Sequence, residues 1–170
     1  DGELDGLSKT WHLNGQLERE TNYKDGALIF IKGWHSNGQL KTETNFKDGE
    51  LDGLRIYWYA NGQLKSKINY KDGELDGLGE AWYQNGQLED KRNYKDGKLD
   101  GLVKAGYING QLEFEANYKD GKLDGLSQRW DIGQNYGSPK MAGHLTIESN
   151  YKDGELDGLS KTWHLNGQLE

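Results

Sequence analysis

The sequence predicts an all-β protein made of tandem β-hairpins of about 24 residues, which together form one elongated, twisted antiparallel meander sheet. The tetrapeptide Asn-Gly-Gln-Leu recurs and begins at Asn14, Asn37, Asn61, Asn85, Asn109 and Asn166. A second marker, aromatic-Lys-Asp-Gly, begins at Tyr23, Phe46, Tyr70, Tyr94, Tyr118 and Tyr151. The chain also carries 25 glycines, which are too frequent for helices.

Each repeat predicts one hairpin, because Asn-Gly between two alternating runs is the strongest short hairpin signal. Asn61-Gly62 joins LRIYWY to LKSKINY, and Asp72-Gly73 offers a second tight turn between one hairpin and the next. We expect a type I′ turn at Asn-Gly, with positive φ at both central residues. Alternation along the strands predicts one face that carries the recurring Leu and Trp and another that is mostly polar.

The repeats predict one continuous array over residues 1–170. Its units are about 1–24, 25–47, 48–71, 72–95, 96–119, 120–152 with an insertion at 131–142, and a partial unit at 153–170. Residues 1–18 return unchanged as 153–170, although neighbouring units differ at positions that the fold does not dictate. We therefore expect a super-period of 152 residues in a longer tandem array. The alternative is a truncated or engineered chain with a copied end.

Composition excludes several classes of protein. The chain has no Cys, so it has no disulfide framework and no Cys-ligated zinc site. No apolar stretch approaches the length of a membrane span. A net charge of −7 with scattered Lys argues against a nucleic-acid partner. Because the chain begins Asp-Gly, with neither an initiator Met nor a signal peptide, a fragment or processed piece is expected.

The run YKDGELDGLxxxWYxNGQL resembles the bacterial variant of the MORN repeat, the type found in YwqK-like antitoxin proteins. The resemblance covers nearly all of the chain and departs from the pattern at residues 27–33 and 131–142. It implies short hairpins in an elongated, twisted or curved sheet and a role in binding or scaffolding. No catalytic residues come with the family.

A column of evenly spaced tryptophans is the most conspicuous candidate site: Trp11, Trp34, Trp58, Trp82, Trp130 and Trp163. Gly106 fills the one vacant slot. Such a column could stack against a glycan. The interpretation we favour is structural, with each ring covering the sheet against its Leu neighbours.

Two irregular segments are candidates for distinctive contacts. The insertion 131–142 predicts a contact loop with Tyr136, Pro139 and Met141, since loops on rigid scaffolds often carry binding. A tolerated surface insertion explains it equally well. The apolar stretch Leu28, Ile29, Phe30 and Ile31 predicts a buried seam or a subunit interface.

No residue is predicted to be catalytic, to bind a cofactor or to ligate a metal. The histidines do not fall at metal-ligand spacing, and none pairs with a plausible nucleophile. Carboxylates four residues apart, as at Asp72 and Asp76, match neither pattern of a calcium loop. Turn chemistry accounts for them.

The sequence thus predicts a non-enzymatic structural repeat protein, a segment of an extracellular or bacterial cell-surface fibre or stalk. Two alternatives stay open: a soluble antitoxin-like or immunity-like scaffold that binds one protein, with a cytoplasmic location, and a glycan-binding module that uses the Trp column. The expected partner is another copy, end to end or lateral, because the first strand, LSKTWHL, is poorly protected against strand pairing. Neither a nucleic acid nor a membrane span is expected.

Overall fold

The regular structure is entirely β-strand. A computed structural model describes residues 2–132, 143–164 and 166–170. In this part of the chain there are fourteen strands, and every strand pair with a determined register is antiparallel. The all-β class and the meander of tandem hairpins are therefore confirmed. The described residues include no helix long and apolar enough to cross a membrane.

The chain divides into two compact units, Asp1–Gly77 and Leu78–Glu170, which we describe separately. Unit 1 contains β1 (Gly6–Trp11), β2 (Leu17–Lys24), β3 (Ala27–Trp34), β4 (Leu40–Lys47), β5 (Glu50–Trp58) and β6 (Leu64–Lys71). Strand β7 (Glu74–Trp82) spans the division. Unit 2 contains β8 (Leu88–Lys95), β9 (Lys98–Leu99), β10 (Gly101–Gly106), β11 (Leu112–Lys119), β12 (Lys122–Asp131), β13 (His144–Lys152) and β14 (Glu155–Thr162).

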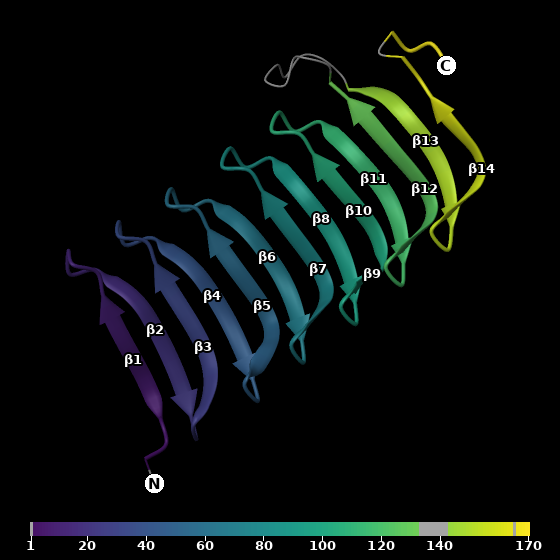
Figure 1. Ribbon diagram of the computed structural model, residues 1–170. Helices are drawn as coiled ribbons and strands as arrows, with labels where there is room; N and C mark the ends of the chain where they lie inside the picture. Colours follow the sequence, from purple (N-terminus) through teal and green to yellow (C-terminus); the bar gives the residue numbers. More distant parts are fainter. Residues whose placement is uncertain (1, 133–142, 165) are drawn as a thin grey trace. The chain divides into compact units, whose positions relative to one another are not determined.

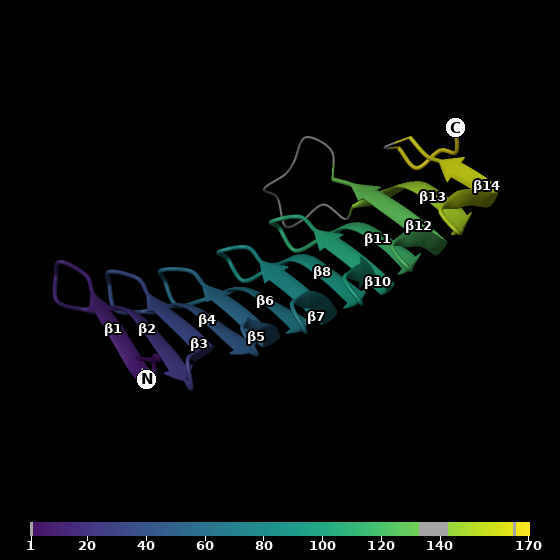
Figure 2. The ribbon, with the colours of Figure 1, turned by 60° about the horizontal axis from the view of Figure 1, so that its bottom comes forward.

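Within each unit the strands pair in the order in which the chain makes them, and short β9 pairs with β8 off this path. Figure 1 shows that the Asn-Gly turns of unit 1 lie at one edge of its strands and the Asp-Gly turns at the other. Figure 2 shows that the strands of each unit form a single layer. The hairpins of each unit therefore lie side by side in one layer (Figure 2).

The two turns differ from the predicted pattern. The Asp-Gly turns have positive φ at both residues, as at Asp25 (50°) and Gly26 (77°), which is the type I′ signature. At the Asn-Gly turns only the Gly has a positive φ. The Gly15 N–H donates a hydrogen bond to the His12 carbonyl at 2.9 Å. This is a type I turn followed by a left-handed Gly. The type I′ conformation predicted for the Asn-Gly turns is thus wrong, and the Asp-Gly turns, predicted only to be tight, adopt it instead.

One face of each unit carries a row of paired charges, which we call the ladder face. In unit 1, successive opposed residues in this row are Lys9, Glu20, Lys32 and Glu43. Lys9 and Glu20 lie 3.0 Å apart, and Lys32 and Glu43 lie 3.1 Å apart. In unit 2 the same row holds Lys91, Lys104, Glu115, Gln128, Glu148 and Lys161.

The opposite face, which we call the groove face, holds the buried side chains. Its central row in unit 1 includes Thr21 and Thr44, which are 7% and 6% exposed. The central row in unit 2 includes Val103, Ala116 and Ser149, which are 6%, 0% and 2% exposed. Small residues fill this row because a single layer of strands has no thick interior.

The expected division into a Leu and Trp face and a polar face is wrong. The register places Leu54 opposite Asn69 and Ile56 opposite Lys67, so these apolar residues share the ladder face with polar ones. Leu54 is 38% exposed. Strand alternation alone could not reveal this arrangement, because the faces of two strands are matched only once the register of their pairing is known.

Candidate functional site: a groove between hairpins

The residue after each Trp position links one hairpin to the next at the Asn-Gly edge. The His12 Nε2 lies 3.0 Å from the Trp34 carbonyl oxygen, and His35 Nε2 makes the same contact with Trp58. In unit 2 the Tyr83 hydroxyl donates to the Gly106 carbonyl at 3.0 Å, and Tyr107 donates to Trp130 at 2.9 Å. Two different side chains therefore make one and the same connection.

The Asn-Gly-Gln turns form a second connection along this edge. The Asn14 side-chain amide donates to the Ser36 carbonyl, and the Asn37 amide donates to the Ala60 carbonyl, both at 2.6 Å. The Gln16 side chain packs against Gly38, because a Cβ built at Gly38 would lie 3.0 Å from the Gln16 Oε1. Each turn thus supports the turn of the following hairpin.

At the opposite edge, the connection uses backbone groups. The Gly26 N–H donates to the Leu4 carbonyl and the Gly73 N–H to the Leu51 carbonyl, both at 2.9 Å. In unit 2, Gly121 and Gly154 make the equivalent bonds with Leu99 and Leu123, both at 2.8 Å. Both edges of the hairpins are therefore held by contacts that repeat from unit to unit.

A β-bulge in the second strand of each hairpin turns one extra side chain onto the surface. Thr10 opposes Arg19 while Trp11 opposes Leu17, which leaves Glu18 without an opposed residue. Lys41 occupies the same place in the next hairpin. In unit 2 the corresponding residues are Glu113 and Thr146.

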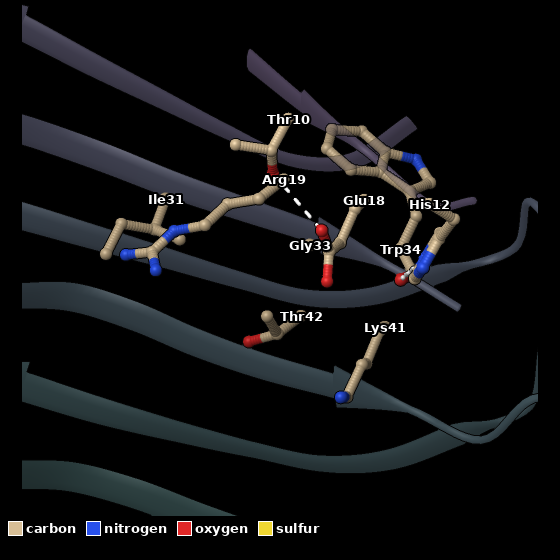
Figure 3. A pocket seen from close by; sticks show the side chains of 9 residues that line it. All are labelled: Thr10, His12, Glu18, Arg19, Ile31, Gly33, Trp34, Lys41 and Thr42. Carbon is tan, nitrogen blue, oxygen red and sulfur yellow. Dashed lines mark hydrogen bonds between the residues drawn. The ribbon is translucent and has the colours of Figure 1, made fainter. Parts of the chain in front are cut away.

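The bulges border a groove on the groove face of unit 1, with a volume of about 470 Å³. Figure 3 shows its lining residues, which come from β1 to β4 and the first Asn-Gly turn. They are Thr10, His12, Glu18, Arg19, Ile31, Gly33, Trp34, Lys41 and Thr42. The Thr10 hydroxyl lies 3.5 Å from the Glu18 carboxylate, and the Trp34 indole forms a wall beside them.

Unit 2 has a smaller groove at the equivalent place, with a volume of about 380 Å³. Its lining includes Tyr107 in the place of His12, Glu113 in the place of Glu18, and Trp130 in the place of Trp34. Arg129 and Ile147 oppose each other at its floor. The hairpin backbone thus builds the groove, and the repeats vary its side chains.

The ladder face perturbs the ionisation of its carboxylates. The pKa of Glu148 lies below its ordinary value, because Gln128 donates a hydrogen bond to the carboxylate and Lys161 does so as well. The Lys152 ammonium hydrogen-bonds Asp124 at 2.7 Å and lowers the pKa of that carboxyl in the same way. These charges stabilise one another in the folded chain.

The predicted Trp column ends the first strand of the hairpins. Trp11, Trp34, Trp58 and Trp130 oppose Leu17, Leu40, Leu64 and Leu145, respectively. Trp163 forms an isolated bridge with Leu169, Trp82 ends β7, and Gly106 takes the Trp place opposite Leu112. A Cβ at Gly106 would lie 2.6 Å from the Leu88 carbonyl oxygen, which explains why no larger residue stands there.

The two irregular segments fall in different places. Tyr136, Pro139 and Met141 of the predicted contact loop lie outside the described residues. Leu28, Ile29, Phe30 and Ile31 belong to β3, which pairs with β2 and β4. Phe30 lies on the ladder face opposite Asn22 and Asn45, whereas Ile31 lines the groove on the other face. The segment therefore divides between two surfaces, and its role as an interface stays a prediction.

Sequence reasoning missed Glu18, Arg19, Lys41 and Thr42, which follow the Leu of two successive Asn-Gly-Gln-Leu motifs. Their recurrence at one place in the repeat was a usable signal, but the bulge that turns them onto the groove face has no simple sequence mark. In the part of the chain that the structure describes, no group of three or more His, Asp or Glu residues is arranged to hold a metal ion.

Comparison with protein families identifies the class of protein. The model of the MORN repeat variant matches residues 4–25, 31–48, 51–72, 75–96 and 99–120. These ranges cover more than half of the chain, so the protein belongs to the MORN repeat variant family. A search among curated proteins gave no match.

Proposed function

We propose that this chain is a non-enzymatic structural scaffold, a segment of a longer tandem array that forms an extracellular or cell-surface fibre. The supporting observation is that several consecutive hairpins are joined by equivalent contacts. Asn14 and Asn37 donate to the next hairpin at 2.6 Å, and so does Asn85 in unit 2. A junction of this kind sets no limit on the number of hairpins.

The 18-residue identity between residues 1–18 and 153–170 also supports a longer array. These segments agree at variable positions such as Lys9 and Lys161, which other hairpins fill differently. A duplication with a period of 152 residues accounts for this agreement. In such an array the irregular features of one period return at regular intervals and mark lateral contacts between fibres.

The proposal is tested with two proteins: the present chain, and a chain with two copies of residues 1–152 followed by residues 1–18. We expect both to self-associate in sedimentation velocity and to form filaments in electron micrographs. The longer chain should also show a proportionally larger β-sheet signal in circular dichroism. Clean monomers of both chains at high concentration, or a monomer that co-purifies with one cognate protein, would overturn the fibre proposal.

A further inference from the structure

The cations of the groove differ from those of the ladder face. Lys9 and Lys32 on the ladder face are ion-paired at 3.0 and 3.1 Å. Among the described residues, no carboxylate lies within ion-pair distance of Arg19 or Lys41. Both side chains are exposed, and both line the groove. The groove therefore presents two cations that make no ion pair with the described residues, beside the single carboxylate of Glu18.

A buried hydroxyl in the same groove also lacks a partner. The Thr42 Oγ1 is buried and makes no hydrogen bond, although a buried polar atom left unpaired costs about 1–3 kcal/mol. The Arg55 Nε is also buried without a hydrogen bond, and the Arg55 guanidinium lies 5.0 Å from the ring centre of Tyr57. Tyr57 opposes Thr42, so both orphaned atoms lie on the groove face. An ordered water or ion accounts for such atoms in many native proteins, and neither atom has surface that a ligand in the groove could touch.

The shape of the groove depends on Gly33. A Cβ at this position would lie 3.0 Å from the Thr42 Cγ2, so any side chain would fill the floor. Figure 3 shows the Glu18 carboxylate directed over Gly33, with the Trp34 indole on one side. The hollow thus combines an aromatic wall, a hydrogen-bond acceptor and two cations.

We propose that this groove binds an acidic sugar unit of a polysaccharide, of the hexuronic acid class. The C–H face of the pyranose ring packs against the Trp34 indole, and the carboxylate lies between Arg19 and Lys41. Sugar hydroxyls donate to Glu18. A phosphate or a polyglutamate segment satisfies the cations equally well, but it offers Glu18 no comparable set of donors. This choice rests on the groove and is independent of fibre formation.

The test is calorimetric titration of the full chain with an oligogalacturonate in about 0.15 M salt, where long-range charge attraction is screened. The oligogalacturonate is compared with a neutral galactose oligomer and with an oligoglutamate of equal charge. We expect the uronate oligomer to bind at least tenfold more tightly than either comparison ligand. Absence of binding, or equal binding of the oligoglutamate, would overturn the proposal.

Variants separate the groove from general charge. Arg19→Gln and Lys41→Gln should each weaken uronate binding about tenfold, whereas Lys24→Gln removes a charge outside the groove and should change it less than twofold. Thr42→Val keeps the shape of the side chain and removes only a buried hydroxyl, so binding should stay within twofold while thermal stability stays the same or rises. Equal losses for Lys24→Gln and Arg19→Gln would contradict the assigned site. Circular dichroism verifies that each variant is folded.

Discussion

Neighbouring hairpins are joined at both edges of their strands, but different chemical groups make the contacts at each edge. At the Asp-Gly edge, neighbouring hairpins are joined by backbone bonds such as Gly26 N–H to the Leu4 carbonyl. At the Asn-Gly edge they are joined by side chains, among them Asn37 and His35. The Asp-Gly edge therefore depends mainly on backbone geometry, whereas the Asn-Gly edge depends on the identity of its side chains.

The difference also accounts for the pattern of variation within the chain. The Asp-Gly edge accepts Glu3 or Lys98 at the same place in the repeat, and either side chain lies near the Gly of the following Asp-Gly turn without a close contact. The Asn-Gly edge repeats Asn-Gly-Gln-Leu six times without change. Each of its first three residues makes a contact that depends on its own side chain or, for Gly, on having none.

The largest expected effect is at Gly62, where Ala would face both strain and a clash. Its φ is 85°, a left-handed conformation that costs a residue with a Cβ about 1–2 kcal/mol, and the new Cβ would displace the Gln39 Oε1, at the end of a flexible side chain, from its contact with the turn. Gly15 has a similar φ of 82° and open space around it. We expect Gly62→Ala to lower the free energy of unfolding by more than Gly15→Ala, as measured by urea denaturation.

Equal effects of these two substitutions would show that the Gln39 contact contributes nothing to the junction. The comparison isolates the contact because both substitutions carry nearly the same backbone strain. A second variant, Gln39→Ala combined with Gly62→Ala, should recover the part of the loss that comes from the clash.

The next effect concerns the Asn side chains. Asn37 donates to the Ala60 carbonyl of the next hairpin and accepts from the Gln39 N–H, whereas Asn61 donates to the side chain of Gln63 within its own turn. Asn37→Ala should therefore destabilise the protein by about 1 kcal/mol more than Asn61→Ala. Thermal denaturation of both variants measures the difference, and a larger loss for Asn61→Ala would contradict the assigned connection.

A smaller loss of stability is expected on substitution of His35, and the control is Tyr, which other hairpins carry at the same place. Phe in this place would lose the hydrogen bond to the Trp58 carbonyl, at a cost of about 0.5–1.5 kcal/mol. Tyr occupies the equivalent place at Tyr83 and donates to Gly106. His35→Tyr should therefore keep most of the stability that His35→Phe loses. If Phe and Tyr behave alike in urea denaturation, the bond is not what stabilises this edge.

The smallest effect is on the ladder face and depends on pH. The pKa of Glu148 is lowered in the folded chain, chiefly by Gln128, so its contribution to stability is present above the carboxyl's ordinary pKa. That contribution is lost as the pH falls through the lowered value. Gln128→Ala should raise the pKa of Glu148 toward its usual range, and Lys161 should keep it slightly lower. NMR titration measures the pKa, and an unchanged value would contradict the role of Gln128.

The sequence was sufficient to predict the hairpins, their period and the turn positions, because Asn-Gly, Asp-Gly and strand alternation are local signals. The sequence was insufficient to predict which residues share a face of the sheet. Leu54 lies with Asn69 because of the pairing register, and the exposure of Glu18 and Lys41 on the groove face depends on bulges. These features arise between strands, where single-strand patterns carry little information. The family resemblance predicted the class of fold and could not predict the groove.

The central claim is that each hairpin is an interchangeable unit joined to its neighbour through its two turn edges. It is tested most directly by deleting residues 48–71, which joins Lys47 to Asp72 and regenerates the Asp-Gly turn, and by duplicating the same residues in a second protein. We predict cooperative urea unfolding of both proteins, with m-values that rise from the deletion variant through the parent chain to the duplication variant. Loss of β-sheet circular dichroism in either protein, or m-values that do not follow this order, would contradict the claim.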